Sequence, residues 1–170
     1  MDLCARLLGL GRDTMGAAMR IEARLKELGL ELPDPPQPVA NYVSWTQADN
    51  VLFLGGVSNR WNGELRYTGK VGSQLTLDDG YQAARLCAFN HIAILKSALG
   101  DLDRVRRILK LVGYINAAPG FNQLPKVLNG ASDLLVEVFG DAGRHARLAL
   151  GVSELNADIP VETEMTVLAD

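Results

Sequence analysis

The sequence predicts an α+β fold in which two helices pack on one face of a mixed β-sheet. Apolar and polar residues alternate over 146–152 and 160–168, and a period of two is typical of a half-buried strand. Apolar residues recur at helical spacing over 76–99 and 125–139. Residues 105–116 are rich in β-branched side chains and are apolar at both alternations, which indicates a strand buried on both faces. The expected order is β-β-(β)-α-β-α-β-β.

Length and composition place the chain among single-domain globular proteins. A chain of 170 residues can bury one full core, and 48% hydrophobic with 22% charged residues is ordinary for such a domain. The net charge of −3 argues against nucleic acid as the main partner, because phosphate binding favours a basic surface. No apolar run approaches the roughly 20 residues that span a bilayer, so no membrane partner is expected. Only Cys4 and Cys87 occur, which predicts a reducing, cytoplasmic compartment.

Residues 1–37 are expected to form an N-terminal arm in front of a folded domain over 38–170. Residues 1–16 mix acidic and basic side chains around a short leucine-rich run, and we interpret them as a disordered segment or a frayed extra helix. Apolar spacing over 16–28 indicates a short helix that Gly29 closes. An extended spacer follows, with prolines at Pro33, Pro35, Pro36 and Pro38.

Strands are expected on both sides of the central helices. The first two lie at 40–45 and 51–57 and are joined by a turn over 47–50. Residues 65–68 can form a further short strand. The last two strands of the chain follow each other after a short turn, and we expect them to form a C-terminal hairpin.

Capping residues set the expected helix boundaries. Thr76 is a suitable N-cap, since Asp78 and Asp79 follow in the first turn, where negative charge suits the helix dipole. Gly100 ends this helix, and Pro125 suits the first turn of the second. The residues expected to face the sheet are Ala84, Cys87, Ala88, His91, Ile94 or Leu95 and Ala98 in the first helix, and Val127, Leu128, Ala131, Leu134, Leu135, Val138 and Phe139 in the second.

Two helices can cover only one face of a sheet of five or six strands. The 105–116 strand nevertheless offers apolar side chains to both faces, so the second face needs cover as well. Either a helix of the N-terminal arm or association between copies can supply it, and we favour association. The two sets are Leu109, Leu111 and Ile115 on one face and Ile108, Val112 and Tyr114 on the other.

Arg147 is the leading candidate for a binding residue. Its guanidinium is permanently charged and belongs where water or an anion can reach it. An arginine that rises from a floor of small residues is suited to hold a small carboxylate. The alternative is a structural arginine that pairs with Glu162 or Glu164 across the C-terminal hairpin. The residues that share its alternation are His145, Ala149 and Gly151.

No metal site is expected. The two histidines, His91 and His145, stand without the cysteine or carboxylate spacing of a metal centre. We interpret His91 as a side chain at the edge of the core, because it lies on the apolar stripe of its helix. The glycines of segment 69–72 lack the P-loop pattern.

Charged, apolar and turn positions follow a fixed order near the C-terminus, as His145-Ala146-Arg147, Val152, Leu155 and Val161-Glu162-Thr163-Glu164. This order resembles the C-terminal signature of the Rid family, the reactive intermediate deaminases, also called YjgF or L-PSP endoribonuclease-like proteins. The resemblance spans roughly 38–168 and fits the longer members of that family. It implies a chorismate-mutase-like α+β domain, assembled as a homotrimer around a central barrel, with ligand pockets between subunits.

The resemblance also implies a reaction, the hydrolysis of enamine or imine acids such as 2-aminoacrylate to 2-keto acids and ammonia, without a cofactor. Arg147 would hold the substrate carboxylate in a bidentate pair, and Glu162 would position or activate the attacking water. The residues implied to bind substrate are Tyr42, Gly55, Gly56, Asn129 and Ala149. One departure stands out, because the family has Ser-Gly at the Gly55-Gly56 pair, and the serine hydroxyl is therefore missing here.

Other interpretations remain open at this stage. Glu162 could be a solvated edge-strand charge, and Asn129 could be an ordinary first-turn helix residue. The alternative function is a non-catalytic trimer that binds small carboxylates or a protein partner. The missing serine hydroxyl favours it, whereas retention of both Arg147 and Glu162 opposes it. Ribonuclease activity, which the family's older name suggests, has little support from an acidic chain.

Overall fold

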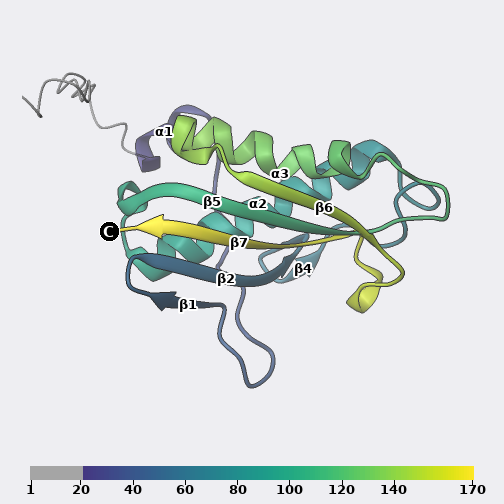
Figure 1. Cartoon of the computed structure of the whole chain (residues 1–170), viewed down its shortest axis with the longest axis horizontal. Coiled ribbons are helices and arrows are strands. Elements are labelled where there is room, and N and C mark those ends of the chain that lie inside the picture. Colours follow the sequence, from purple (N-terminus) through teal and green to yellow (C-terminus); the bar gives the residue numbers. More distant parts are fainter. Residues whose placement is uncertain (1–20) are drawn as a thin grey trace, which may run out of the picture.

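The computed structural model of the protein describes residues 21–170, which form a five-stranded mixed sheet with two long helices on one face (Figure 1). The strand order is β1-β2-β7-β5-β6. The mixed α+β fold is as predicted. The expectations for residues 1–16, and for the beginning of the 16–28 helix, lie outside the described part of the chain. The strands are β1 Trp45–Ala48, β2 Val51–Ser58, β5 Val105–Asn116, β6 Ala146–Val152 and β7 Val161–Ala169, and a separate pair is β3 Arg60–Trp61 with β4 Glu64–Leu65.

The last two strands do not form the predicted hairpin. β5 lies between them, parallel to β6 and antiparallel to β7. β6 follows β5 and helix α3 in a β-α-β unit, which brings it back parallel to β5, and the chain then crosses the end of β5 to enter β7. A period of two in the sequence identifies a strand, but it does not show which strands pair with it. Pairing of Arg147 with Glu162 or Glu164 across a hairpin is therefore wrong.

Helix α2, Leu77–Leu99, begins and ends where the capping residues predicted. The Thr76 hydroxyl accepts from the Asp79 N–H at 3.1 Å, and the Asp79 carboxylate accepts from the Thr76 N–H at 2.8 Å, which together make a capping box. Gly100 closes the helix at φ 74°, a conformation that favours glycine. In Figure 1 this helix passes behind the sheet.

Helix α3, Leu124–Phe139, also matches its prediction, with Pro125 in the first turn and the expected apolar residues buried. Two glycines set how closely it packs. A Cβ at Gly130 would lie 1.9 Å from the Tyr81 carbonyl oxygen of α2, and a Cβ at Gly113 of β5 would lie 2.4 Å from Leu128. α3 can therefore lie directly against both α2 and the sheet.

The N-terminal edge of the sheet differs from the prediction. β1 covers Trp45–Ala48 instead of 40–45, because Asp49 adopts φ 51° and makes a tight turn directly into β2. Residues 39–44 form an exposed loop in which Val39, Tyr42 and Val43 are more than half exposed. The further short strand expected at 65–68 is a two-residue strand at 64–65.

A β-bulge changes which residues of β5 face the helices. Its register against β7 shifts between Ile108 and Lys110, so Ile108 lies opposite Val167 and joins Leu111 and Ile115 in the core. The prediction that Ile108 shares a face with Val112 and Tyr114 is therefore wrong. An extra residue in a strand reverses the alternation on one side of it, and a simple period of two cannot show where that happens.

Helix α1, Ile21–Glu27, packs on the helical side of the sheet, beside α3 (Figure 1). Its first turn is bound to the segment before β5. The Ile21 N–H donates to Asp103 Oδ1 at 2.6 Å, while the Glu22 carboxylate accepts from the Leu102 N–H at 3.1 Å and from Lys96. The described part of the N-terminal helix therefore does not cover the opposite face of the sheet, which was one of our two alternatives; residues 1–20 of the arm lie outside the described chain.

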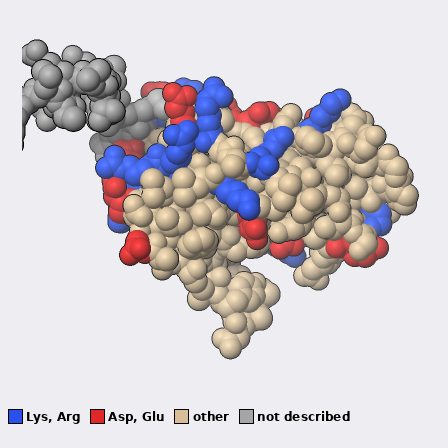
Figure 2. Space-filling model, viewed as in Figure 1, with Lys and Arg blue, Asp and Glu red and all other residues tan. Residues whose placement is uncertain are grey.

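The face of the sheet away from the helices remains open within residues 21–170. Phe53, Leu148 and Leu150 are 49%, 46% and 41% exposed there. Figure 2 shows this face with several Lys and Arg side chains among residues that carry no charge. Exposed apolar side chains that gather on one face of a sheet favour a contact with another molecule. Among the described helices, none is both long and apolar enough to cross a bilayer.

Candidate functional site

Arg147 lies on β6, the edge strand, and its side chain points toward α3. Ala149 and Gly151, two and four positions further along β6, face that helix too. Ala149 packs against the core, and a Cβ at Gly151 would lie 3.3 Å from Leu124 of α3. The small side chains form the floor that the sequence predicted. Arg147 Nη1 donates to Asn129 Oδ1 at 2.8 Å and to Ser132 Oγ at 3.1 Å, and Nη2 donates to the Pro125 carbonyl at 3.3 Å.

These contacts engage one side of the guanidinium and leave the other available. Of its five N–H donors, three are used, and those on Nε and the second on Nη2 have no partner among the described residues. The side chain of Arg147 is exposed, so an anion can approach it. Nε and Nη2 share one edge of the guanidinium, and two adjacent donors are the arrangement that binds a carboxylate.

Asn129, a predicted substrate-binding residue, contacts Arg147. Ser132 also contacts Arg147, and His145 contacts Ser132, but neither is among the predicted site residues. Ser132 lies one helical turn after Asn129, and its Oγ is 3.1 Å from His145 Nε2. Both residues carried a signal in the sequence. Spacing of three on a helix places Ser132 beside Asn129, and His145 shares the alternation of Arg147. Burial, aided by the charge of Arg147, lowers the pKa of His145.

Glu162 lies on the opposite face of the sheet. Its neighbours in β7 point toward α2, since His91 Nε2 lies 3.0 Å from Thr163 Oγ1 and the Cys87 thiol donates to the Val161 carbonyl at 3.6 Å. Glu162 therefore points to the open face. Burial, and to a smaller degree the charge of Glu164, raises its pKa above the ordinary value. A carboxyl with a raised pKa is suited to proton transfer near neutral pH.

Gly56 makes room for the Glu162 carboxylate. The two glycines Gly55 and Gly56 occupy a bulge of β2 between Leu54 and Val57. A Cβ at Gly56 would lie 2.1 Å from Glu162 Oε1, so a larger residue there would displace the carboxylate. A Cβ at Gly55 meets only the carbonyl oxygens of Ser44 and Val43, at ordinary distances of 3.6 and 3.9 Å. The backbone therefore accommodates a serine at Gly55, although this chain has none.

Tyr42 belongs to the exposed loop in front of β1. Its hydroxyl accepts a hydrogen bond from the Val39 N–H at 3.4 Å, and its side chain is 56% exposed. Two residues later, the Ser44 carbonyl accepts from the Gly55 N–H at 2.9 Å. The Tyr42 loop is thus joined to the part of β2 that carries Gly55 and Gly56, at the edge of the sheet opposite to β6.

The predicted site residues therefore fall into two half-sites. The first, the arginine half-site, consists of Arg147, Asn129 and Ala149 beside α3. The second, the glutamate half-site, consists of Glu162, Gly55, Gly56 and the Tyr42 loop. Arg147 lies opposite Leu111 and Glu162 opposite Tyr114, with β5 between them. Sheet geometry separates their Cα atoms by about 14 Å, and the two side chains point to opposite faces.

Three hollows on the surface of the described chain lie elsewhere. The largest, of about 400 Å³, is open and is lined by Trp61, Arg66, Tyr67 and Leu86. The others lie beside α1 and along the proline-rich spacer. None of these three includes Arg147 or Glu162 in its lining.

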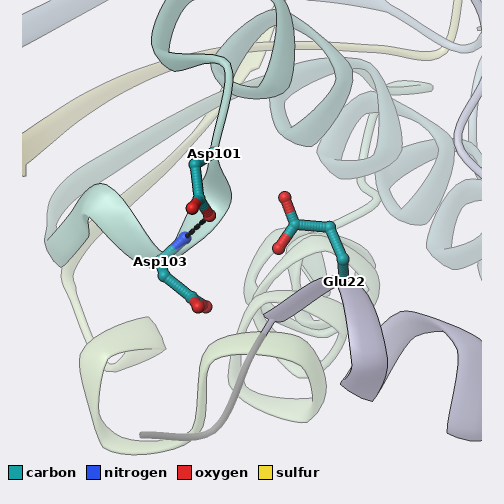
Figure 3. A group of neighbouring side chains, drawn as sticks. All are labelled: Glu22, Asp101 and Asp103. Atoms are coloured by element: carbon teal, nitrogen blue, oxygen red, sulfur yellow. Dashed lines mark hydrogen bonds between the residues drawn. The ribbon is translucent and has the colours of Figure 1, made fainter.

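The remaining titratable clusters of the described chain serve the fold. Glu22, Asp101 and Asp103 point toward one another (Figure 3), but the carboxylates of Glu22 and Asp103 accept the N–H groups that attach α1, and Asp101 accepts the Asp103 N–H. Burial lowers the pKa of His91 to about 3 and raises that of the Cys87 thiol. Both groups are uncharged at physiological pH and fully buried in the core.

Known proteins match this chain along most of its length. The family model described as "YjgF/chorismate mutase-like, putative endoribonuclease" matches residues 22–162. Protein TCP17 of Trypanosoma cruzi is 41% identical over 152 residues, which are 89% of this chain and 95% of TCP17. Among solved structures, Atu1372 of Agrobacterium tumefaciens, a protein of unknown function, is 42% identical with a TM-score of 0.82 and covers 88% of this chain and 92% of its own. A "putative endoribonuclease" of Shewanella oneidensis is 36% identical with a TM-score of 0.85, covering 88% and 99%.

Proposed function

Because the chain belongs to the YjgF/chorismate-mutase-like family, we propose that it is a Rid-type deaminase that hydrolyses small enamine or imine acids. The substrate class is that of 2-aminoacrylate, and the products are a 2-keto acid and ammonia. The active site forms between copies of the chain, in a homotrimer around a central barrel. Arg147 of one copy and Glu162 of the next face the same ligand.

The observation that carries this proposal is the division of the site into two half-sites. The arginine half-site, formed by Arg147, Asn129 and Ala149, offers two unused N–H donors and contains no carboxyl group. The glutamate half-site offers a carboxyl with a raised pKa and contains no arginine or lysine. Each supplies what the other lacks. The apolar side chains of Phe53, Leu148 and Leu150 on the open face supply the contact through which copies associate.

The reaction needs little beyond positioning, since an imine carbon is already electrophilic. Arg147 holds the carboxylate, and water adds to the imine carbon as Glu162 takes its proton. With the imine nitrogen protonated, this addition gives a neutral carbinolamine. Glu162 passes the proton to the amine, and as ammonia leaves, the carbinolamine hydroxyl gives its proton back to Glu162 and becomes the keto oxygen. Backbone groups near Gly56 and on the free edge of β6 at Ala149 orient the imine and the water. No cofactor takes part.

The second candidate function is a non-catalytic module that binds small carboxylates or a protein partner. Gly55 favours it, because the family's serine hydroxyl is absent at a position where the backbone accommodates it. Such a module would keep the Arg147 contact with an acid and release no product. Binding and turnover therefore have to be measured separately.

The first prediction concerns Arg147→Ala. Imines are generated in situ by an amino-acid oxidase or a threonine dehydratase, and the release of ammonia and keto acid is followed. We expect the wild-type protein to accelerate release and Arg147→Ala to reduce that acceleration by about 100-fold or more, since loss of a bidentate charged contact costs roughly 3 kcal/mol.

Arg144→Ala is the matched control, because Arg144 is an exposed arginine three residues earlier that pairs with the surface carboxylate of Asp141. It should leave the rate unchanged. Binding of 2-ketobutyrate that depends on Arg147, without turnover, would favour the non-catalytic module. Equal rates for wild type and Arg147→Ala would end the proposal.

A further inference from the structure

A chain of three hydrogen bonds leads from the backbone to Arg147. His145 Nδ1 lies 2.6 Å from the Gly143 carbonyl oxygen, which can only accept, so Nδ1 carries the hydrogen. In the neutral ring Nε2 is then an acceptor, and the Ser132 hydroxyl, 3.1 Å away, donates to it. Burial lowers the pKa of His145, so the neutral ring is the form present at neutral pH.

The Ser132 hydroxyl has a single hydrogen, which it donates in a hydrogen bond to His145 Nε2. The oxygen therefore turns its lone pairs to Arg147, whose Nη1 donates to it at 3.1 Å, while the second N–H of Nη1 goes to Asn129 Oδ1. Both hydrogens of Nη1 are thus bound within the chain. Rotation of Arg147 to present Nη1 to a ligand would break two hydrogen bonds, whereas Nε and Nη2 can be presented without breaking either.

We propose that His145 is a positioning residue that acts through Ser132 to fix the Arg147 guanidinium with its Nε–Nη2 edge toward the ligand. Without an acceptor at Nε2, the Ser132 hydroxyl is free to rotate and can direct its hydrogen at Nη1, so that two donors face each other. That the ligand is a carboxylate rests on the proposed function. The orientation of the guanidinium does not, and it can be measured without any ligand.

Two substitutions test the roles of the two ring nitrogens of His145 separately. In His145→Asn the side-chain amide can still donate to Gly143, but it offers no acceptor at the position of Nε2. In His145→Gln the carbonyl oxygen reaches that position. Nitrogen-15 spectra of the Arg147 side chain should show a restricted, resolved Nη1 in wild type and His145→Gln, and a motionally averaged signal in His145→Asn and Ser132→Ala. An Nη1 signal in His145→Asn and Ser132→Ala that matches wild type would overturn the proposal.

Affinity for 2-ketobutyrate is the second measurement. His145→Asn and Ser132→Ala should each bind it roughly fivefold to tenfold more weakly, the effect of one hydrogen bond, with melting temperatures close to wild type. The double variant should bind no more weakly than Ser132→Ala, because His145 acts through Ser132. Additive losses would contradict that route. If Arg147→Ala abolishes binding of 2-ketobutyrate and His145→Asn does not weaken it, only the proposed role of His145 is wrong. If Arg147→Ala binds 2-ketobutyrate as wild type does, the proposed function is wrong, and the spectra still decide the role of His145.

Discussion

At the residue scale, Arg147 is held in place before any ligand arrives. Arginine has a long, flexible side chain, and ordering it on binding costs free energy. Here Asn129, Ser132 and the Pro125 carbonyl restrict the guanidinium in advance. These contacts do not engage the whole guanidinium. It is bound through three donors, and two remain.

The glycine in place of the family's serine gives a residue-scale prediction. A Cβ at Gly55 would have only ordinary contacts, so Gly55→Ser should fold normally and add a hydroxyl beside Gly56. If this hydroxyl helps to orient the substrate, we expect imine hydrolysis to rise roughly tenfold, the effect of one added hydrogen bond to the transition state. The same assay of ammonia and keto-acid release measures it.

Gly55→Ala is the control for this substitution, because it adds the Cβ without the hydroxyl. It should leave the rate near that of wild type. If Gly55→Ser and Gly55→Ala behave alike, the hydroxyl does not orient the substrate in this protein, and the missing serine does not explain any difference in rate from other members of the family.

At the element scale, the parts of the fold that the sequence predicts well are those with strong local signals. Helices α2 and α3 have caps and long apolar stripes, and β5 has β-branched residues on both alternations. The sequence places β1 too early, because the apolar residues of 40–43 are typical of a strand. They lie instead in an exposed loop, since the backbone partners that would make them a strand begin only at Trp45.

The packing of α2 against β7 makes stability depend on pH. His91 is fully buried with a pKa of about 3, compared with 6.5 ordinarily, because burial opposes its charged form. Below pH 6.5 the unfolded chain binds a proton at this residue and the folded chain does not, so stability is lost as the pH falls from 6.5 toward 3. Between pH 7.5 and 5.0 His91 alone should lower the free energy of unfolding by about 2 kcal/mol.

Urea unfolding of wild type and His91→Gln at the two pH values measures this contribution. Glutamine can still donate to the Thr163 carbonyl but does not titrate, so the variant should lose about 2 kcal/mol less than wild type on acidification. His145→Gln is the comparison, because His145 is only partly buried and its removal should change the pH dependence less. An equal loss in wild type and His91→Gln would show that His91 does not cause the acid sensitivity.

At the scale of the whole molecule, the identity of the candidate residues was predictable and their arrangement was not. The alternation of β6 correctly set Arg147 with Ala149 and Gly151, and that of β7 set Glu162 apart from Val161 and Thr163. Whether Arg147 and Glu162 lie on the same face of the sheet depends on which strand lies between β6 and β7. That is decided by the path of the chain through α3, and no residue pattern within β6 or β7 records it.

The division into half-sites predicts complementation between inactive chains. If each site takes Arg147 from one copy and Glu162 from another, trimers of Arg147→Ala or of Glu162→Gln alone lack one group in every site and should be inactive. When the two chains are mixed equally and assembled together, half of the contributing arginines and half of the glutamates are intact. About a quarter of the sites then have both, so activity should recover to roughly a quarter of wild type.

A second mixture distinguishes this arrangement from a site within one copy. Wild type mixed equally with the double variant Arg147→Ala, Glu162→Gln should also keep about a quarter of its activity if the two residues come from different copies, but about half if they act in the same copy. The single variants mixed together would in that second case stay inactive. Sedimentation of each sample checks that assembly is intact, so that the two fractions report the origin of the residues and not a loss of trimers.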